Sequence, residues 1–297
     1  MTSVQRPALN HTPTIGVFDS GFGGLTVLRA LVERIPQARY AFLGDTARLP
    51  YGSKSRRTIA RYAAESAQFL VHKQGAEFLV IACNTASALA LDAIQEAVPV
   101  PVLGVIEPGA IAARQASVTG DVLVIATEAT VQSHAYAAAC HARGLRALEK
   151  ACPLLVPLVE EGWTDHPVTA EVIEIYLNEL RAEAAAQGMN QDALVLGCTH
   201  YPLLRPLIER AVRPGVKVID SAEATALAAV EQFNGRLELS APSQSTAEAG
   251  SRPPAAASAS QTEIRCFATD SVEKFERLGS RFLGRPVGHV TLIDLGG

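Results

Sequence analysis

The 297-residue sequence has no apolar run that approaches the roughly 20 residues a membrane-spanning helix needs. Its polar segment 1–14 also lacks the apolar core of a signal peptide. The net charge is −4, so nothing in the composition favours nucleic acid or an anionic membrane as a partner. We therefore expect a cytoplasmic protein with no nucleic-acid or membrane partner.

Paired cysteines are absent as well. The five cysteines are widely scattered and none belongs to a Cys-x-x-Cys pair, which disfavours a zinc ribbon or a redox dithiol. We expect free thiols in a reducing cytosol, and no metal site. Three of them, Cys140, Cys152 and Cys266, are interpreted as structural.

A nucleotide-binding loop is the third missing feature. Gly21, Gly23 and Gly24 follow a predicted strand, but their spacing is not Gly-x-Gly-x-x-Gly and no P-loop lysine follows. These glycines instead predict a close approach of the backbone to a small anionic ligand. Asp19, just before them, fits a capping or turn residue and a functional group equally well.

The sequence does contain an alternation of apolar strands and helical segments. Strands are expected at 15–18, 40–43, 78–82, 102–105, 122–125, 193–196, 216–219, 264–269 and 288–295. Helices are expected at 25–35, 57–73, 86–97, 130–143, 168–187, 203–212 and 222–233. Continuous apolar strands that alternate with helices are typical of parallel sheets covered on both faces, so the predicted fold class is α/β.

The length suggests two domains, and a short internal repeat agrees with this. The segments 78–86 and 193–201 each read as a buried strand that ends in a cysteine, followed by a threonine and a helix. Parallel sheets bind ligands beyond the carboxyl ends of their strands. Two such domains facing each other would therefore bring Cys83 and Cys198 into one cleft from opposite sides.

The domain boundaries follow from the order of the predicted elements. We assign residues 14–106 and 213–297 to the first α/β domain, and residues 107–212 to the second. The Ser-, Ala- and Pro-rich segment 239–262 is expected to be a flexible insertion in the first domain without a catalytic role.

Two opposed thiols suit the inversion of a chiral carbon, which needs a base on one face and an acid on the other. With an unperturbed pKa of about 8.5, a thiolate at pH 7 costs only about 2 kcal/mol. Because both cysteines precede predicted helices, we expect helix N-termini to offset that cost. Stabilising the carbanion is the harder task, and Asn84, Thr85 and Thr199 are candidate donors for it.

Six stretches of the chain resemble the glutamate racemases of the aspartate/glutamate racemase superfamily. These are 16–28, 44–52, 81–86, 104–109, 152–162 and 196–203, in the order of that family. The closing segment 267–295 is similar to the end of the family as well. The resemblance implies two pseudo-symmetric α/β domains with mainly parallel sheets, and an active site in the cleft between them.

The resemblance also implies an activity. It is the interconversion of L- and D-glutamate by two cysteines, with Cys83 acting on the D-enantiomer and Cys198 on the L-enantiomer. No pyridoxal phosphate, metal or nucleotide is expected as a cofactor. The product would supply peptidoglycan synthesis, and the protein is expected to be a homodimer.

The remaining site residues follow from the same resemblance. Asp19 would assist Cys83, while His200 and an acidic residue, Glu160 or Glu161, would assist Cys198; we favour Glu160. Substrate contacts would come from Asp19, Ser20, Tyr51, Gly52, Asn84, Thr85, Thr127, Thr199 and His200. Thr127 and Thr130 lie in the stretch expected to bind the side-chain carboxylate of the substrate.

Two alternatives remain open at this point. The same scaffold would suit an aspartate racemase, a hydantoin racemase or a maleate isomerase. A function of a different class is a binding protein that regulates a partner such as DNA gyrase. The lack of a basic patch argues against direct DNA contact, and a pure binding module would not need two thiols.

Overall fold

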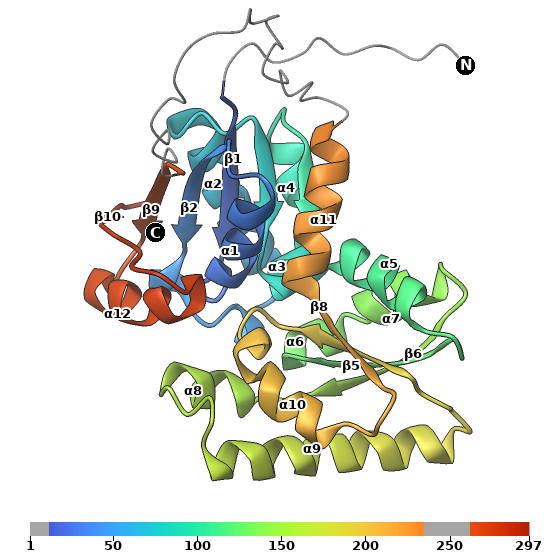
Figure 1. The fold of residues 1–297 in the computed structure, drawn as a ribbon. Coiled ribbons are helices and arrows are strands. Elements are labelled where there is room, and N and C mark those ends of the chain that lie inside the picture. The colour runs from blue at the N-terminus through green and yellow to red at the C-terminus, as the bar shows by residue number, and fades with distance from the viewer. Residues whose placement is uncertain (1–11, 235–261, 297) are drawn as a thin grey trace, which may run out of the picture.

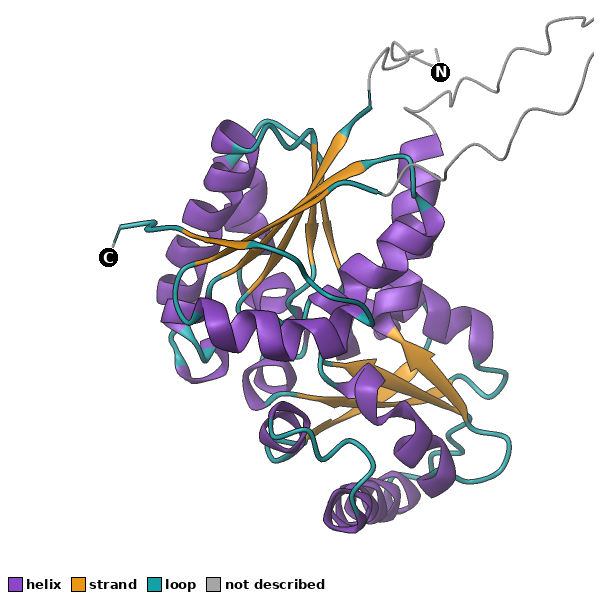
Figure 2. Cartoon of the chain, turned by 60° about the vertical axis from the view of Figure 1, so that its left-hand side comes forward, coloured by secondary structure: helices purple, strands orange, loops and turns teal. Residues whose placement is uncertain are grey.

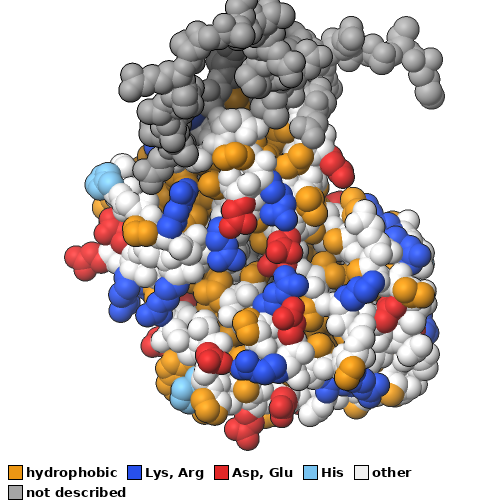
Figure 3. All heavy atoms as spheres, in the orientation of Figure 1, with side chains coloured by type: hydrophobic (Ala, Val, Ile, Leu, Met, Phe, Trp, Pro, Cys, Tyr) orange, Lys and Arg blue, Asp and Glu red, His pale blue; other side chains and the backbone are white. Residues whose placement is uncertain are grey.

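The computed structural model describes residues 12–234 and 262–296, so that 239–261 of the predicted insertion lie outside it. Two parallel sheets, each with helices on both faces, form the two halves of the molecule (Figures 1 and 2). On the face drawn in Figure 3, basic side chains are interspersed with acidic ones and neither sign forms a continuous patch. In the described part of the chain, no helix is both long and apolar enough to cross a membrane.

Four neighbouring strands of the first sheet have the same order as the four strands of the second. In the first, the order is β10-β9-β2-β1-β3-β4, and in the second it is β6-β5-β7-β8; every pairing is parallel. The first sheet consists of β1 (Thr14–Asp19), β2 (Arg39–Gly44), β3 (Phe78–Ile81), β4 (Val102–Gly104), β9 (Ile264–Ala268) and β10 (Val290–Leu292). The second consists of β5 (Asp121–Ala126), β6 (Arg146–Ala151), β7 (Ala193–Gly197) and β8 (Lys217–Asp220). Since β2-β1-β3-β4 corresponds to β6-β5-β7-β8, the predicted pseudo-symmetric α/β fold is confirmed.

Helices cover both sheets. The helices of the first half are α1 (Leu25–Arg34), α2 (Arg56–Gln68), α3 (Asn84–Leu89), α4 (Leu91–Ala97) and α12 (Val272–Leu283). Those of the second half are α5 (Ile106–Ala116), α6 (Glu128–Gln132), α7 (Ala135–His141), α8 (Leu155–Glu160), α9 (Pro167–Ala186) and α10 (Arg205–Ala211). The remaining helix, α11 (Ser221–Asn234), contacts both α1 and α5 and so joins the halves (Figure 1).

Burial on both faces fixes the strands of the first sheet. Val17 packs into the core on the α1 side, while Phe18 and Ile81 pack into the core on the other side, with Ile59 of α2. A strand buried on both faces reads as a continuous apolar run, which is why the sequence located it. Asp19 is the last residue of β1, and so this polar side chain lies at the carboxyl-terminal end of a central strand.

Several elements differ from the sequence-based prediction. The predicted helices 86–97 and 130–143 are each broken, the second at His134, which has left-handed backbone angles (φ 54°). Strand β6 and the helices α5, α8 and α12 were not predicted. Strand β6 lies at a sheet edge, where its charged residues stay half-exposed and hide the apolar period. The first turn of α5 contains Glu107-Pro108-Gly109, a sequence that is typical of a turn.

Strand β8 bears on the domain boundary predicted at residue 213. Strand β8 pairs with β7 in the second sheet, with Leu194 opposite Val218. Residues 213–220 therefore belong with the second sheet, and the chain returns to the first half only through α11. A short apolar strand fits either sheet equally well, so its partner is set by tertiary packing rather than by its own sequence. We propose Asp220 as the end of the second domain.

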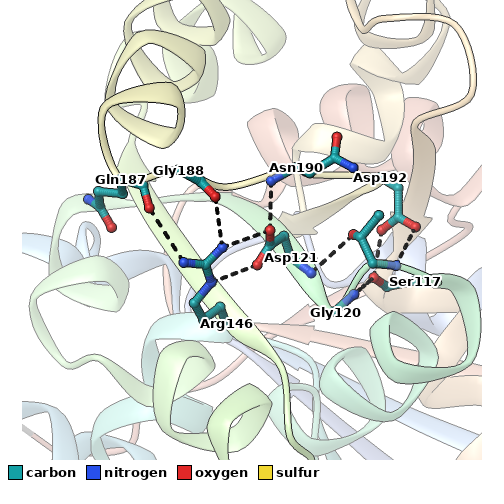
Figure 4. A network of polar contacts seen from close by, with 9 residues as sticks. Ser117, Gly120, Asp121, Arg146, Gln187, Gly188, Asn190 and Asp192 are labelled. Carbon is teal, nitrogen blue, oxygen red and sulfur yellow. Dashed lines mark hydrogen bonds and ion pairs between the residues drawn. The ribbon is translucent and has the colours of Figure 1, made fainter.

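A polar network links the strands of the second sheet at their amino-terminal ends, opposite to the end where Cys198 lies (Figure 4). Arg146 of β6 donates from Nε and Nη2 to the two carboxylate oxygens of Asp121, at 2.7 and 2.9 Å. The same Nη2 donates to the carbonyl of Gly188, and the N–H of Asn190 donates to Asp121. The network thus joins β5 and β6 to the loop before β7.

Asp192 gives the first testable prediction, which concerns stability. Its carboxylate accepts hydrogen bonds from Ser117 Oγ and from the N–H groups of Val118 and Thr119, at 2.6, 2.7 and 3.0 Å. Burial raises its pKa, but these hydrogen bonds outweigh burial and lower the pKa to about 2. Asp192→Asn should therefore lower the free energy of unfolding at pH 7 by about 1–3 kcal/mol.

The pH dependence checks the cause. A carboxylate whose pKa is depressed on folding contributes stability above its unfolded pKa of about 3.9, and loses it as pH falls toward the folded value. Urea unfolding of wild type and Asp192→Asn should thus show a constant difference from pH 7 to pH 5 that shrinks below pH 4. A difference that stays constant down to pH 3 would mean that the charge of Asp192 does not matter.

Candidate active site

A cavity of about 500 Å³ lies between the two halves, and most of the predicted site residues line it. Those residues are Ser20, Tyr51, Gly52, Cys83, Asn84, Thr85, Thr127, Glu160, Cys198, Thr199 and His200. Cys83 follows β3 and Cys198 follows β7, the two strands that hold equivalent places in the sheets. Each cysteine is only 5% exposed. The structure therefore brings the two thiols to one cavity from opposite halves.

Cys83 sits at the start of α3 and accepts a hydrogen bond from the N–H of Ala86 at 3.4 Å. Its thiol donates to Ser20 Oγ at 3.3 Å. Burial, and next the charge of Asp19, raise the pKa of this thiol to about 12 despite those hydrogen bonds. The expectation that a helix N-terminus would make the thiolate easily accessible is therefore wrong for Cys83, because desolvation is the larger effect.

Asp19 lies at the end of β1, just outside the residues that line the cavity, and is 2% exposed. Its Oδ2 accepts the N–H of Gly21 at 2.9 Å, whereas Oδ1 has no hydrogen-bond partner in the described part of the chain. Burial raises its pKa, and the hydrogen bonds and the charge of His200 oppose that rise. Asp19 thus forms a turn and does not cap α1, which begins without any side-chain cap.

The second thiol has different neighbours. His200 Nδ1 lies 3.9 Å from Cys198 Sγ, and His200 Nε2 lies 3.4 Å from Glu160 Oε1. Burial lowers the pKa of His200, but its contacts with Cys198 and Glu160 outweigh burial and raise it to about 10. Burial raises the pKa of Glu160, but His200 and Lys274 outweigh it and lower that pKa overall. At neutral pH the thiol of Cys198 therefore faces an imidazolium.

The choice between Glu160 and Glu161 can be judged from this geometry. Glu160 is the last residue of α8, contacts His200 and lines the cavity. Glu161 is exposed and does not line it. The geometry favours Glu160 as the acidic neighbour of the second thiol.

The polar residues after Cys83 also face the second half. Tyr136 of α7 donates to Asn84 Oδ1 at 2.7 Å, while Asn84 Nδ2 has no partner among the described residues. The hydroxyl of Thr85 lies 3.1 Å from that of Thr127 and 3.3 Å from that of Thr130. Asn84 therefore offers a free amide donor, and the three threonines form a hydroxyl cluster across the boundary.

The glycine loop corrects another expectation. A Cβ on Gly23 would lie 2.4 Å from Thr199 Oγ1 and 2.6 Å from the His200 ring, and a Cβ on Gly24 would lie 2.6 Å from Cβ of Asp19. Neither these glycines nor Gly21 lines the cavity. The close approach that they permit is to the side chains of the site rather than to a ligand.

Tyr51 lines the cavity, and the hydrogen bond of its hydroxyl gives the second prediction. Its hydroxyl donates to the fully buried Asp45 Oδ2 at 2.6 Å, and Thr269 donates to Asp45 Oδ1 at 2.9 Å. Tyr51→Phe should destabilise the protein by about 1–3 kcal/mol, because it leaves a buried acceptor with one donor fewer. Urea unfolding measures this, with Tyr62→Phe as control, since the Tyr62 ring lies 6.3 Å away and its hydroxyl has no hydrogen bond in the described residues. An equal loss in both variants would contradict it.

Sequence reasoning missed part of the cavity wall. The additional lining residues are Leu49, Pro50, Glu128, Pro153, Val156, Pro157 and Lys274. Pro153, Val156 and Pro157 fall inside the stretch 152–162 singled out above, and so a signal was present for them. Lys274 lies on the unpredicted helix α12, and a lone lysine on a helix gives no signal in sequence.

Comparison with known proteins agrees with this arrangement. Residues 15–229 match the Asp/Glu/Hydantoin racemase family. A glutamate racemase of Koribacter versatilis is 55% identical over 290 residues, which cover 96% of this chain and 98% of that protein.

Solved structures agree as well. A glutamate racemase isoform from Bacillus anthracis has a TM-score of 0.80 and 36% identity, and one from Francisella tularensis, in complex with D-glutamate, has 0.79 and 34%; each match covers 97% of this chain and 99% of the other. The chain therefore belongs to the Asp/Glu/Hydantoin racemase family, and within it to the glutamate racemases.

Proposed function

We propose that this enzyme interconverts L- and D-glutamate by proton transfer between two thiols and the α-carbon. The observation that carries the proposal is the placement of Cys83 and Cys198 at equivalent strand ends of two pseudo-symmetric sheets, facing one cavity. An α-carbon held between them would have a proton acceptor on one face and a donor on the other. The identity of the substrate, glutamate, is inferred from the glutamate racemases that this chain resembles.

The different surroundings of the thiols suggest their states before reaction. A thiol with a pKa of about 12 keeps its proton at pH 7, so Cys83 begins as the acid. Cys198, whose Sγ lies 3.9 Å from Nδ1 of His200, is then the base toward L-glutamate. The Cys198 thiolate takes the α-proton, and the Cys83 thiol delivers its own proton to the opposite face. D-Glutamate leaves behind a Cys198 thiol and a Cys83 thiolate, and the reverse reaction begins from that state.

The polar groups of the wall would bind and orient glutamate. Asn84 Nδ2 can donate to a substrate carboxylate, because Tyr136 already engages its amide oxygen. The hydroxyls of Thr85 and Thr127, which line the cavity and contact the buried hydroxyl of Thr130, can receive the second carboxylate. Asp19 lies just outside this wall, and its Oδ1, which has no partner among the described residues, is suited to accept from Cys83 or from the substrate ammonium. Preorganised donors of this kind stabilise developing negative charge without reorganising during the reaction.

An exchange experiment tests the function. Purified protein is incubated with L-glutamate in D₂O without added cofactor, while circular dichroism and α-deuteration by NMR are recorded. Loss of optical activity together with α-deuteration supports the proposal. If aspartate or a hydantoin reacts and glutamate does not, the substrate is wrong. If no amino acid exchanges its α-hydrogen, the proposal fails and a binding role takes its place.

The biological setting belongs to the same proposal. The enzyme would act in the cytoplasm as a homodimer, on free glutamate and without a cofactor. The D-glutamate that it forms would be used for peptidoglycan synthesis. Sedimentation equilibrium measures the oligomeric state. A strain that lacks the gene should need external D-glutamate for growth if this setting is right.

A further inference from the structure

Lys274 reaches the cavity from the helix that sequence reasoning missed. Helix α12 lies between β9 and β10 of the first sheet, whereas Glu160 ends α8 in the second half. Lys274 Nζ donates to Glu160 Oε2 at 3.1 Å, and the contact therefore spans the boundary between the halves. Among the described residues that line the cavity, Lys274 is the one lysine or arginine.

The carboxylate of Glu160 is shared between two cations. Its Oε1 lies 3.4 Å from His200 Nε2, and its Oε2 takes the hydrogen bond from Lys274. The Glu160 side chain is 23% exposed, so without a second partner it is free to turn toward water. A carboxylate engaged on both oxygens keeps one orientation, and that orientation points Oε1 at the imidazole.

Aromatic packing holds the lysine at this place. Its ammonium group lies 5.6 Å from the centre of the Phe22 ring, and that ring lies 6.1 Å from the His200 ring. Phe282, also on α12, meets His200 edge-on with 5.0 Å between ring centres. Helix α12 thus contacts His200 directly through Phe282 and indirectly through Lys274 and Glu160.

We propose that Lys274 is a positioning residue, whose ammonium group holds the Glu160 carboxylate against His200 and thereby supports the Cys198 half of the site alone. The inference rests on the proposed two-thiol function. Lys274 touches neither thiol, and its effect passes through Glu160 and His200. Loss of Lys274 should weaken the imidazolium beside Cys198 and leave the surroundings of Cys83 unchanged.

Three variants test this role. Lys274→Met removes the charge, Lys274→Arg keeps it, and Arg277→Met removes an exposed charge from the same helix as a matched control. We expect Lys274→Met to lower kcat for glutamate by about five-fold, the upper end for an ion pair this exposed, with KM nearly unchanged. Lys274→Arg should restore most of kcat, and Arg277→Met should match wild type.

Alkylation gives a readout that needs no substrate. Each protein is treated with iodoacetamide at pH 7, and the labelled peptides are quantified by mass spectrometry. Lys274→Met should slow the labelling of Cys198 by a similar factor and leave that of Cys83 as in wild type, since only a thiolate reacts readily.

Three results would overturn the inference. The first is a rise in KM at constant kcat, which would make Lys274 a substrate ligand. The second is an equal decrease in the alkylation rates of Cys83 and Cys198. The third is an unchanged alkylation rate of Cys198. Wild type that leaves glutamate untouched would refute the proposed function instead, and the labelling comparison would still decide the role of Lys274.

Discussion

Replacing either Cys83 or Cys198 with serine is expected to reduce racemisation of glutamate by about 10²–10⁴-fold, the usual contribution of a positioned acid or base. A hydroxyl has nearly the size of a thiol, but it does not ionise at neutral pH. The variant therefore keeps the shape of the cavity and loses one of the two proton carriers. Polarimetry in both directions, with L- and with D-glutamate, measures the loss.

Rates alone cannot assign the two thiols. The enantiomers have equal free energy, so kcat/KM must fall equally in the two directions for any variant. Hydrogen exchange in D₂O makes the distinction. Cys83→Ser keeps Cys198, and should exchange the α-hydrogen of L-glutamate with retention while leaving D-glutamate untouched. Cys198→Ser should show the opposite preference.

A third cysteine provides the control for these variants. Cys266 of β9 is buried in the core, and burial raises its pKa to about 12. Cys266→Ala should keep wild-type kcat even if it unfolds more easily. Full racemisation by either serine variant would contradict the two-thiol proposal. Exchange of both enantiomers by one serine variant would instead indicate that a single base serves both faces.

The sequence located the strand ends and their chemistry because both leave local signals. Continuous apolar runs ending in Cys-Asn-Thr and Cys-Thr-His predicted where polar groups would meet, and the cavity contains both. The resemblance added Ser20, Tyr51 and Gly52, which composition and period alone do not indicate.

What the sequence could not predict depends on contacts between distant segments. The pKa of Cys83 rises because the thiol is buried beside Asp19, which comes from another strand, and no local pattern measures burial. Strand β8 joins the second sheet through a pairing with β7 that its few residues do not encode. Lys274 lies at the site because α12 packs near Glu160 of the other half, and no local sequence pattern indicates that contact.

Gly23→Ala should lower kcat/KM by about 10²-fold, the effect expected when a site group is displaced by about 1 Å. Gly23 stands just before α1, in the first half, against the segment that follows β7 in the second. A methyl group there would lie 2.4 Å from Thr199 Oγ1 and 2.6 Å from the His200 ring, closer than real contacts. Thr26 Oγ1 also donates to the Thr199 carbonyl at 3.1 Å, and so holds this segment in place.

The damage should be to the site and not to the fold. Gly23 has no left-handed backbone angle, so alanine is compatible with its conformation and reduces the entropy of the unfolded chain. The methyl group can be accommodated only if His200 turns or the halves separate, and either change breaks the alignment of His200 with Cys198. Gly21→Ala is the matched control, because its methyl group would meet only the flexible side chain of Leu49, at 3.2 Å. Activity of Gly23→Ala equal to that of Gly21→Ala would mean that this contact does not set the position of His200. A selective loss of activity with an unchanged urea midpoint would show that the absence of a side chain at Gly23 keeps His200 aligned with Cys198.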